Sequence, residues 1–82
     1  MVSSGTIKWK SIKKMLKDCA PGHKIAEGDH YYRITYKDRT YRSFPKGTHG
    51  KSNPEIERGH VRKLVRFLKI KYDCAKKALP AL

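Results

Sequence analysis

The sequence has few cysteines and no C-x-x-C or H-x-x-x-H spacing, and these shortages exclude several classes of protein. Its 82 residues contain two cysteines, Cys19 and Cys74, which are too few for a disulfide scaffold. Each falls in a helical pattern where a small buried apolar residue serves, so we expect both to fill core positions. Without the ligand spacing of a zinc site, the sequence predicts neither a metal centre nor any other cofactor.

No apolar run in the sequence approaches the length of a transmembrane helix. The opening stretch MVSSGTIKWK also lacks the apolar segment of a secretory signal, so we expect a cytoplasmic protein. A chain of 82 residues is too short for a second hydrophobic core. We therefore expect a flexible start over 1–5, one domain over 6–79 and a tail over 80–82.

Acidic residues are scarce as well. Seven Asp and Glu stand against twenty Lys and Arg, which gives a formal charge of +13 and a pI of about 10.1. Such a chain attracts polyanions, either nucleic acid or an acidic protein. A membrane surface is a poorer match, because an interfacial anchor needs a wide apolar helix face that these helices use for the core. The alternative is a face kept positive for solubility, but so large an excess of one sign favours a polyanionic partner.

What is present is a clear alternation of helical and extended patterns. The first helical pattern runs from Thr6, a candidate N-cap, to Cys19, and the segment 20–22 (APG) ends it. A second pattern has its apolar stripe at Val61, Leu64, Val65 and Leu68, although Gly59 leaves its start open. Asp73 is a candidate cap for a short last helix over 74–79.

Three short runs between the two helices are typical of strands, namely 23–27, 30–37 and 40–45. In the middle run, Tyr32, Ile34 and Tyr36 share one face, which we expect to point at the core. Short turn-like connections predict an antiparallel meander. The order α-β-β-β-α with a short C-terminal helix therefore predicts an α+β fold, a two-layer sandwich with two helices on one face of one sheet.

Basic residues gather on the second helix and in the loop before it. Arg58, Arg62 and Arg66 recur every four residues, with Lys69 one turn further on. Like charges at this spacing repel each other unless a polyanion lies opposite, so we expect this ridge to face phosphates. The loop adds Lys46, His49 and Lys51 ahead of a helix N-terminus, where free backbone N–H groups favour phosphate. Together these groups suit A-form RNA gripped by its shape.

His30 stands at the joint between the turn 27–29 and the middle strand. An imidazole is the natural acid/base near neutral pH, and it can take the proton of a ribose 2′-OH so that this oxygen attacks the neighbouring phosphate. The alternative is a half-buried strand-edge residue, because His30 shares its parity with Tyr32. Three other histidines compete for any catalytic role, namely His23, His49 and His60. Because His60 lies near the start of a helix, we expect a structural role for it.

Four short blocks, in order, resemble the HicA-type toxins, the small mRNA interferases of bacterial toxin–antitoxin pairs. A Lys-rich amphipathic helix comes first, and Gly28-Asp29-His30 then opens a strand where the family has Gly-Ser-His. A third strand runs to Pro45, and His49-Gly50-Lys51 sits in the loop. The most specific block is 56–70, IERGHVRKLVRFLKI, which resembles the helix of that family. The resemblance covers roughly residues 6–79.

The resemblance implies a double-stranded-RNA-binding-domain-like fold, a metal-independent ribonuclease that acts on mRNA, and His30 as the catalytic histidine. It also implies an acidic antitoxin of HicB type that covers the active site. Asp29 departs from the family serine, and its carboxylate would either orient the imidazole or repel the RNA backbone. The candidate RNA-binding residues are Arg33, Arg42, Lys46, His49, Lys51, Arg58, Arg62 and Arg66. Of these, Arg58, Arg62 and Arg66 are candidates either for RNA docking or for the antitoxin interface.

Three functions therefore follow from the sequence as hypotheses. The first is the ribonuclease toxin. The second is a non-catalytic module of the same fold that binds RNA or another nucleic acid. The third is a protein-interaction domain with an acidic partner. Cleavage of a transcript in EDTA, and its loss on replacement of His30, separates the first from the other two.

Overall fold

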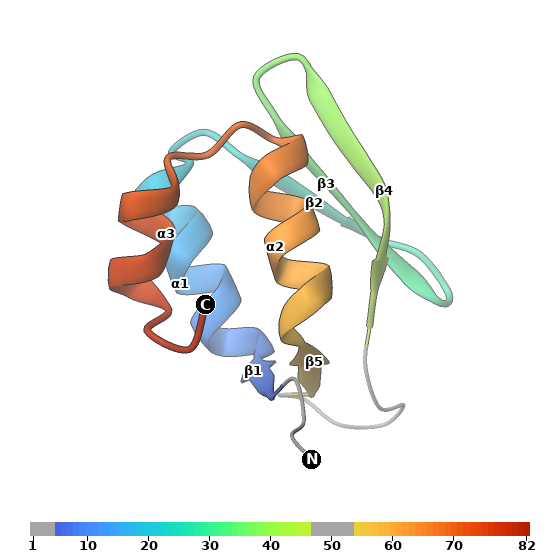
Figure 1. The fold of residues 1–82 in the computed structure, drawn as a ribbon. Helices are drawn as coiled ribbons and strands as arrows, with labels where there is room; N and C mark the ends of the chain where they lie inside the picture. Colours follow the sequence, from blue (N-terminus) through green and yellow to red (C-terminus); the bar gives the residue numbers. More distant parts are fainter. Residues whose placement is uncertain (1–4, 47–53) are drawn as a thin grey trace.

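The computed structural model describes residues 5–46 and 54–82. Their elements, in chain order, are β1 (Thr6–Lys8), α1 (Trp9–Cys19), β2 (Lys24–Glu27), β3 (Tyr31–Tyr36), β4 (Arg39–Pro45), β5 (Glu55–Glu57), α2 (Arg58–Phe67) and α3 (Tyr72–Ala78). Figure 1 shows their arrangement. The predicted class, a small α+β domain with an antiparallel meander between helices, is confirmed.

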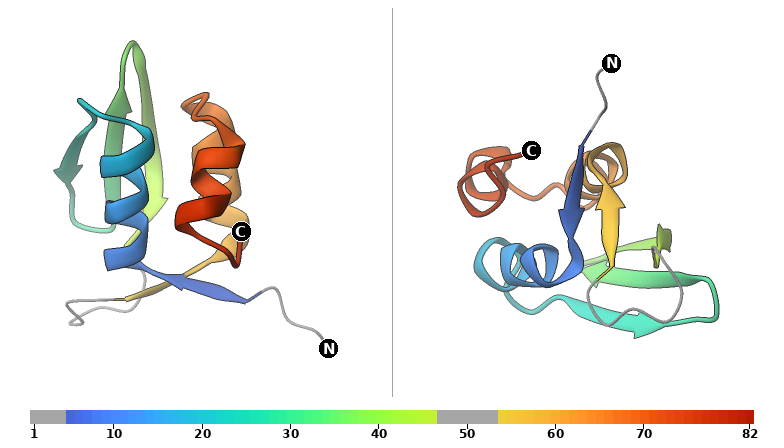
Figure 2. Two further views of the ribbon diagram at one scale, coloured as in Figure 1. Left: turned by 90° about the vertical axis from the view of Figure 1, so that its left-hand side faces the viewer. Right: turned by 90° about the horizontal axis from the view of Figure 1, so that it is seen from below.

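The meander is a three-stranded antiparallel sheet in the order β2-β3-β4. The predicted inward face of β3 is confirmed, because Ile34 is fully buried while Tyr32 and Tyr36 are half-buried against the same core. Trp9, at the start of α1, stacks on Tyr32 with the ring centroids 4.2 Å apart. Figure 2 shows α1 and α2 on one side of this sheet and α3 as the helix furthest from it.

A β-bulge in β4 interrupts the regular alternation of that strand. Tyr32 pairs with Phe44 and Ile34 pairs with Tyr41, so two residues of β4 stand opposite Arg33 alone. Phe44 and Tyr41 are three positions apart, and on a regular strand one of them would point away from the core. The bulge turns both rings inward, where their centroids lie 6.2 Å apart. It also leaves two neighbouring residues, Arg42 and Ser43, exposed on the other side.

Deletion of Ser43 tests this account of the bulge. The shortened strand would place Tyr41 and Phe44 on one face with regular pairing, so we expect a cost of no more than about 1 kcal/mol in the free energy of unfolding. Deletion of Arg33 from the facing strand is the matched control. It would turn Tyr32 outward, and we expect a loss of about 3 kcal/mol or more. Urea unfolding of both variants makes the comparison, and equal losses would contradict the bulge assignment.

A second, two-stranded sheet corrects the predicted start of the first helix. Residues Thr6–Lys8 form β1 and pair with β5, so α1 begins at Trp9 and Thr6 is not its N-cap. Ile7 pairs with Ile56, and both side chains are buried. The Trp9 amide donates to the Pro54 carbonyl at 2.9 Å, across the same junction. The extended conformation of Thr6–Lys8 therefore depends on a partner far away in the sequence, which local helical spacing does not register.

The last helix also differs from its prediction. It begins at Tyr72, with Lys71 in the N-cap position, so Asp73 lies in the first turn and does not cap it. Cys74 of this helix forms a disulfide with Cys19 of α1, with the Cα atoms 5.8 Å apart. The interpretation of the two cysteines as separate core residues was therefore wrong. Both side chains lie half-buried at the contact between α1 and α3.

Residues 80–82, predicted as a tail, fold back on α2. The Leu82 side chain is 2% exposed and belongs to the core cluster. Arg58 donates to the Ala81 carbonyl at 3.1 Å, and Arg62 donates to the Leu82 carbonyl at 3.3 Å. The hydroxyl of Tyr72 donates to the same Leu82 oxygen at 3.4 Å. This segment therefore packs between α2 and α3.

Candidate nucleic-acid interface

His30 lies in the turn between β2 and β3, immediately before the first residue of β3, and its side chain is exposed. The Gly28 amide donates to the Tyr31 carbonyl at 2.9 Å and closes this turn. A Cβ at Gly28 would lie 3.1 Å from that carbonyl oxygen, so glycine suits the close approach. The backbone on either side of His30 is thus fixed while the imidazole is accessible to a ligand in solvent.

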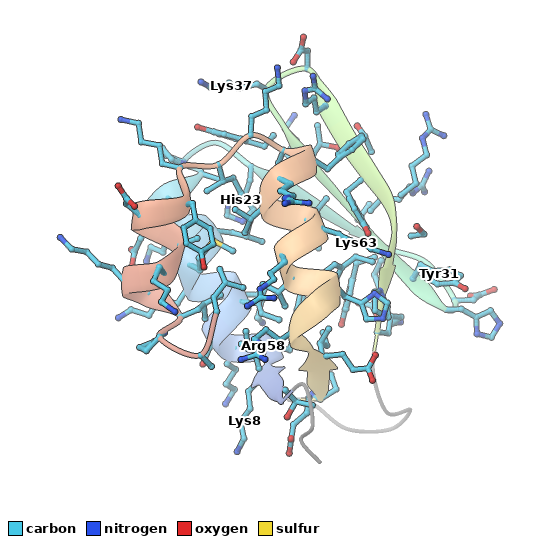
Figure 3. The ribbon with its side chains drawn as sticks, viewed as in Figure 1. Lys8, His23, Tyr31, Lys37, Arg58 and Lys63 are labelled. Atoms are coloured by element: carbon cyan, nitrogen blue, oxygen red, sulfur yellow. A yellow bond between two sulfur atoms is a disulfide. The ribbon has the colours of Figure 1, made fainter. Side chains whose placement is uncertain are left out.

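The side of the sheet that faces away from α1 and α2 is not covered by any helix that the structure describes. We call this side the open sheet face, and by alternation along β2, β3 and β4 it consists of Lys24, Ala26, Tyr31, Arg33, Thr35, Thr40 and Pro45, with Arg42 and Ser43 at the bulge. Tyr31 is 51% exposed and directly follows His30. Figure 3 shows its ring projecting from the sheet edge.

Two of the predicted RNA-binding residues, Arg33 and Arg42, meet on the open sheet face. The bulge brings Arg42 opposite Arg33, and both side chains are exposed. Neither has a carboxylate partner among the described residues, whose ion pairs are Lys46–Glu27 and His60–Glu57. An exposed tyrosine beside two unpaired guanidinium groups is the combination that stacks a base and holds a phosphate.

Lys46 lies at the same end of the sheet, but its ammonium is engaged within the protein. It donates to the Glu27 carboxylate at 2.7 Å and to the Gly28 carbonyl at 3.0 Å. It also lies 5.5 Å from the centroid of the Tyr32 ring. The hydrogen bond to Glu27 raises the pKa of Lys46 above its ordinary value. Lys46 therefore fixes the end of β4 against the turn that holds His30, rather than standing free for phosphate.

Tyr32 gives a pH-dependent test of this corner. Burial, and then the Glu27 carboxylate, raise the pKa of its phenol above the ordinary value of about 10, while Lys46 lowers it. The folded chain then keeps a proton that the unfolded chain releases, so this stability is present below about pH 10 and is lost as the pH rises through the raised pKa. The raised pKa of Lys46 acts in the same direction.

We therefore expect Tyr32→Phe to lose less stability than the parent chain between about pH 9 and pH 11. Thermal unfolding at the two pH values measures the difference. Tyr31→Phe, which removes an exposed phenol, is the control, and we expect it to behave like the parent. If Tyr32→Phe lost as much stability as the parent chain over this pH range, the raised pKa of Tyr32 would be contradicted.

Two further predicted residues, His49 and Lys51, lie outside the described residues. The remaining three lie on α2, on the opposite side of the sheet from Arg33 and Arg42. Arg58 and Arg62 of this set donate to carbonyls of residues 81 and 82, and Figure 3 shows Arg58 beside the base of α2. Arg66 is exposed. The predicted RNA-binding residues are thus divided between two faces, and only the face with Arg33 and Arg42 adjoins His30.

The other described histidines lie next to the ends of helices. The Nδ1 atom of His23 lies 2.9 Å from the Ala20 carbonyl oxygen, just past the end of α1. The Nε2 atom of His60 lies 3.6 Å from the Glu57 carboxylate, one turn away at the start of α2. Within residues 5–46 and 54–82, no group of three or more His, Cys, Asp and Glu side chains is placed to hold a metal ion. Among the described histidines, His30 is the one that lies at the end of the sheet where Tyr31 is exposed.

Sequence reasoning missed a basic hollow between α2 and α3. Its lining combines Arg62, Arg66 and Lys69 with Lys63 and Tyr72. The sequence indicated the basic side of this hollow in part, because Lys69 continues the spacing of the arginines on α2. The contribution of Tyr72 depends on the position of α3, which the disulfide and the packing of residues 80–82 determine.

Comparisons with protein-family models, with curated proteins and with solved structures find no match to this chain. None of the helices in the described part of the chain is long and apolar enough to cross a bilayer.

Proposed function

We propose that this chain is an endoribonuclease that cleaves mRNA without a metal ion and acts as a toxin of the HicA type. The observation that carries the proposal is the place of His30, which is exposed in the turn that leads into β3 and immediately precedes Tyr31, on the strand that carries Arg33 opposite Arg42. The fold that the proposal assumes is double-stranded-RNA-binding-domain-like. Its support is the three-stranded antiparallel sheet with α1 and α2 on one side, to which β1, β5 and α3 are additions.

In the proposed reaction the imidazole of His30 takes the proton of a ribose 2′-OH. The 2′ oxygen then bonds to the adjacent phosphorus, the bond from phosphorus to the 5′ oxygen breaks, and that oxygen receives a proton from the imidazolium or from water. Arg33 and Arg42 offset the charge that develops on the phosphate oxygens. Tyr31 holds a base by stacking. The products are a 2′,3′-cyclic phosphate and a 5′-hydroxyl end.

The direct test is incubation of the purified chain with an end-labelled transcript in EDTA. We expect cleavage that leaves cyclic phosphate ends, because the reaction uses the 2′ oxygen. A DNA strand of the same sequence is the control, and it should stay intact. Cleavage of both strands, or of neither, would contradict the proposal.

Action on mRNA places the protein in the cytoplasm, and the excess of positive charge suits an acidic antitoxin of HicB type as its partner. The cytoplasm is a reducing compartment in which structural disulfides are rare. The proposal therefore requires that the fold survive reduction of the Cys19–Cys74 bond. Running the cleavage assay with and without dithiothreitol checks this requirement, and inactivity of the reduced chain would contradict the cytoplasmic location.

The second candidate function is RNA or other nucleic-acid binding without cleavage. The observation that favours it is the bulge, because Arg33 and Arg42 are exposed side by side whatever His30 does. For either function we expect Arg33→Ala and Arg42→Ala each to weaken RNA binding and to lower the slope of log K against log salt by about one unit. Fluorescence anisotropy at several salt concentrations measures the slope. An unchanged slope would contradict a phosphate contact on the open sheet face.

A further inference from the structure

A hollow of about 770 Å³ lies along α2. Figures 1 and 2 show that α2 lies on the side of the sheet opposite the open sheet face. Its cations are Arg62, Lys63, Arg66 and Lys69, and Tyr72 of α3 lies on its rim. Val65 and Ile70, both buried, contribute its apolar floor. The hollow is therefore basic at its edges and apolar at its base.

A second hollow of about 380 Å³ lies on the other flank of α2, toward β4. Lys63 and Arg66 line both hollows and form the ridge between them. Phe67 lines the second hollow, is 41% exposed and meets Tyr41 edge-on. We call the six residues Arg62, Lys63, Arg66, Phe67, Lys69 and Tyr72 the α2 surface.

Within the described residues, the cations of the α2 surface have no Asp or Glu side chain to balance them. No acidic side chain lines either hollow, and none of the four cations forms an ion pair with an Asp or Glu among these residues. Arg62 donates to the backbone oxygen of Leu82. Like charges three or four residues apart on one helix repel each other, so an anionic partner would relieve this repulsion.

The α2 surface also has exposed aromatic rings on both sides of its cations. Three large apolar side chains are exposed among the described residues, and two of them, Phe67 and Tyr72 at 41% and 50%, belong to it. Arginine and exposed aromatic residues are the types enriched at the centres of protein–protein interfaces. A single-stranded nucleic acid can also stack bases on such rings, but the buried Val65 and Ile70 that line the larger hollow favour an aliphatic side chain of a polypeptide there.

We propose that the α2 surface docks an acidic polypeptide segment that has apolar side chains between its carboxylates. The carboxylates lie on the ridge formed by Lys63 and Arg66 and on Lys69. The apolar side chains enter the two hollows and contact Phe67 on one side and Tyr72 on the other. This inference does not depend on RNA cleavage, because none of these residues adjoins His30.

The test uses a synthetic acidic peptide in which leucines recur every three or four residues and glutamates lie between them. A control peptide has the same charge with glutamine in place of leucine. Binding is measured by fluorescence anisotropy for the parent chain and for two double variants, Arg66→Glu/Lys69→Glu on the α2 surface and Arg33→Glu/Arg42→Glu on the open sheet face. The two variants change the net charge equally, and all four side chains are exposed, so both should fold. Circular dichroism verifies folding.

We expect the α2 variant to weaken binding of the leucine peptide about tenfold or more and the sheet variant to change it much less. The glutamine peptide should bind at least about tenfold more weakly than the leucine peptide. For a short RNA we expect the reverse, with a larger loss of affinity in the sheet variant than in the α2 variant.

Absence of saturable binding of the leucine peptide, equal losses in both variants, or equal affinity for both peptides would overturn the inference. Greater loss of RNA than of peptide binding in the α2 variant would assign the surface to nucleic acid and would overturn it as well. Failure of the RNA arm alone would count against the proposed function and not against the docking surface.

Discussion

We expect His30→Ala to lower the proposed RNA cleavage on the order of 10²–10⁴-fold, which is the contribution of a positioned acid/base group. The effect is this large because no other described histidine lies at the Tyr31 end of the open sheet face. His23 precedes Lys24 at the other end of the sheet, and His60 lies on α2. Single-turnover cleavage of a labelled transcript by the parent and the variant measures the loss.

Folding and RNA binding should change little in the same variant. The His30 side chain is exposed, and substitutions at exposed positions usually change the free energy of unfolding by about 0.5 kcal/mol or less. His60→Ala is the control, since it removes a partly exposed imidazole on another element, α2, and we expect its cleavage rate to equal that of the parent. Full activity of His30→Ala would remove the catalytic hypothesis and leave the binding module.

Loss of the disulfide is the second large effect. The bond joins residues that are 55 positions apart, and closing a loop of this length restricts the unfolded chain. The chain-entropy estimate for such a loop is about 4 kcal/mol at room temperature. We expect Cys19→Ala/Cys74→Ala to lower the free energy of unfolding by roughly this amount and the melting temperature by about 20 °C.

The weakened chain should still fold, because α3 keeps its apolar contacts without the bond. Ala75 and Leu79 are buried in the core cluster, and Leu82 joins them. Thermal and urea unfolding of the oxidised parent, the reduced parent and the double variant make the comparison. The reduced parent and the double variant should have the same melting temperature and the same free energy of unfolding. An unchanged melting temperature on reduction would show that the bond adds nothing to stability.

The elements that depend on local patterns were predictable from the sequence. The apolar stripe of α2 and the alternation of Tyr32, Ile34 and Tyr36 gave the correct faces, because each pattern extends over several residues of one element. The end of α1 was also correct, since Ala20 follows the helix and Gly22 has a φ of +88°. Such features are determined by residues close together in the chain.

The features that depend on distant residues were not predictable in the same way. β1 exists because Ile7 pairs with Ile56, and the disulfide exists because α3 packs beside α1. The bulge in β4 left a trace in the sequence, because Tyr41 and Phe44 are both aromatic but three positions apart. Recognising it required the knowledge that both rings face the same core.

The candidate site was predictable in its residues but not in their grouping. From the sequence, eight basic residues were predicted to form one RNA-binding set. The structure separates Arg33 and Arg42 from the arginines of α2. Two of the α2 arginines bond to carbonyls at residues 81 and 82, which are far from them in the chain. The ion pair of Lys46 with Glu27 likewise joins residues that are distant in the chain, because β4 ends beside the turn after β2.

The central claim is that RNA lies on the open sheet face beside His30. The most direct test is an NMR titration of the isotope-labelled chain with a short RNA whose 2′ oxygens are methylated, so that it binds but cannot be cleaved. We predict that the amide shifts concentrate at Tyr31, Arg33 and Arg42. Shifts concentrated on α2, at Arg62 and Arg66, with none on the sheet would contradict the claim.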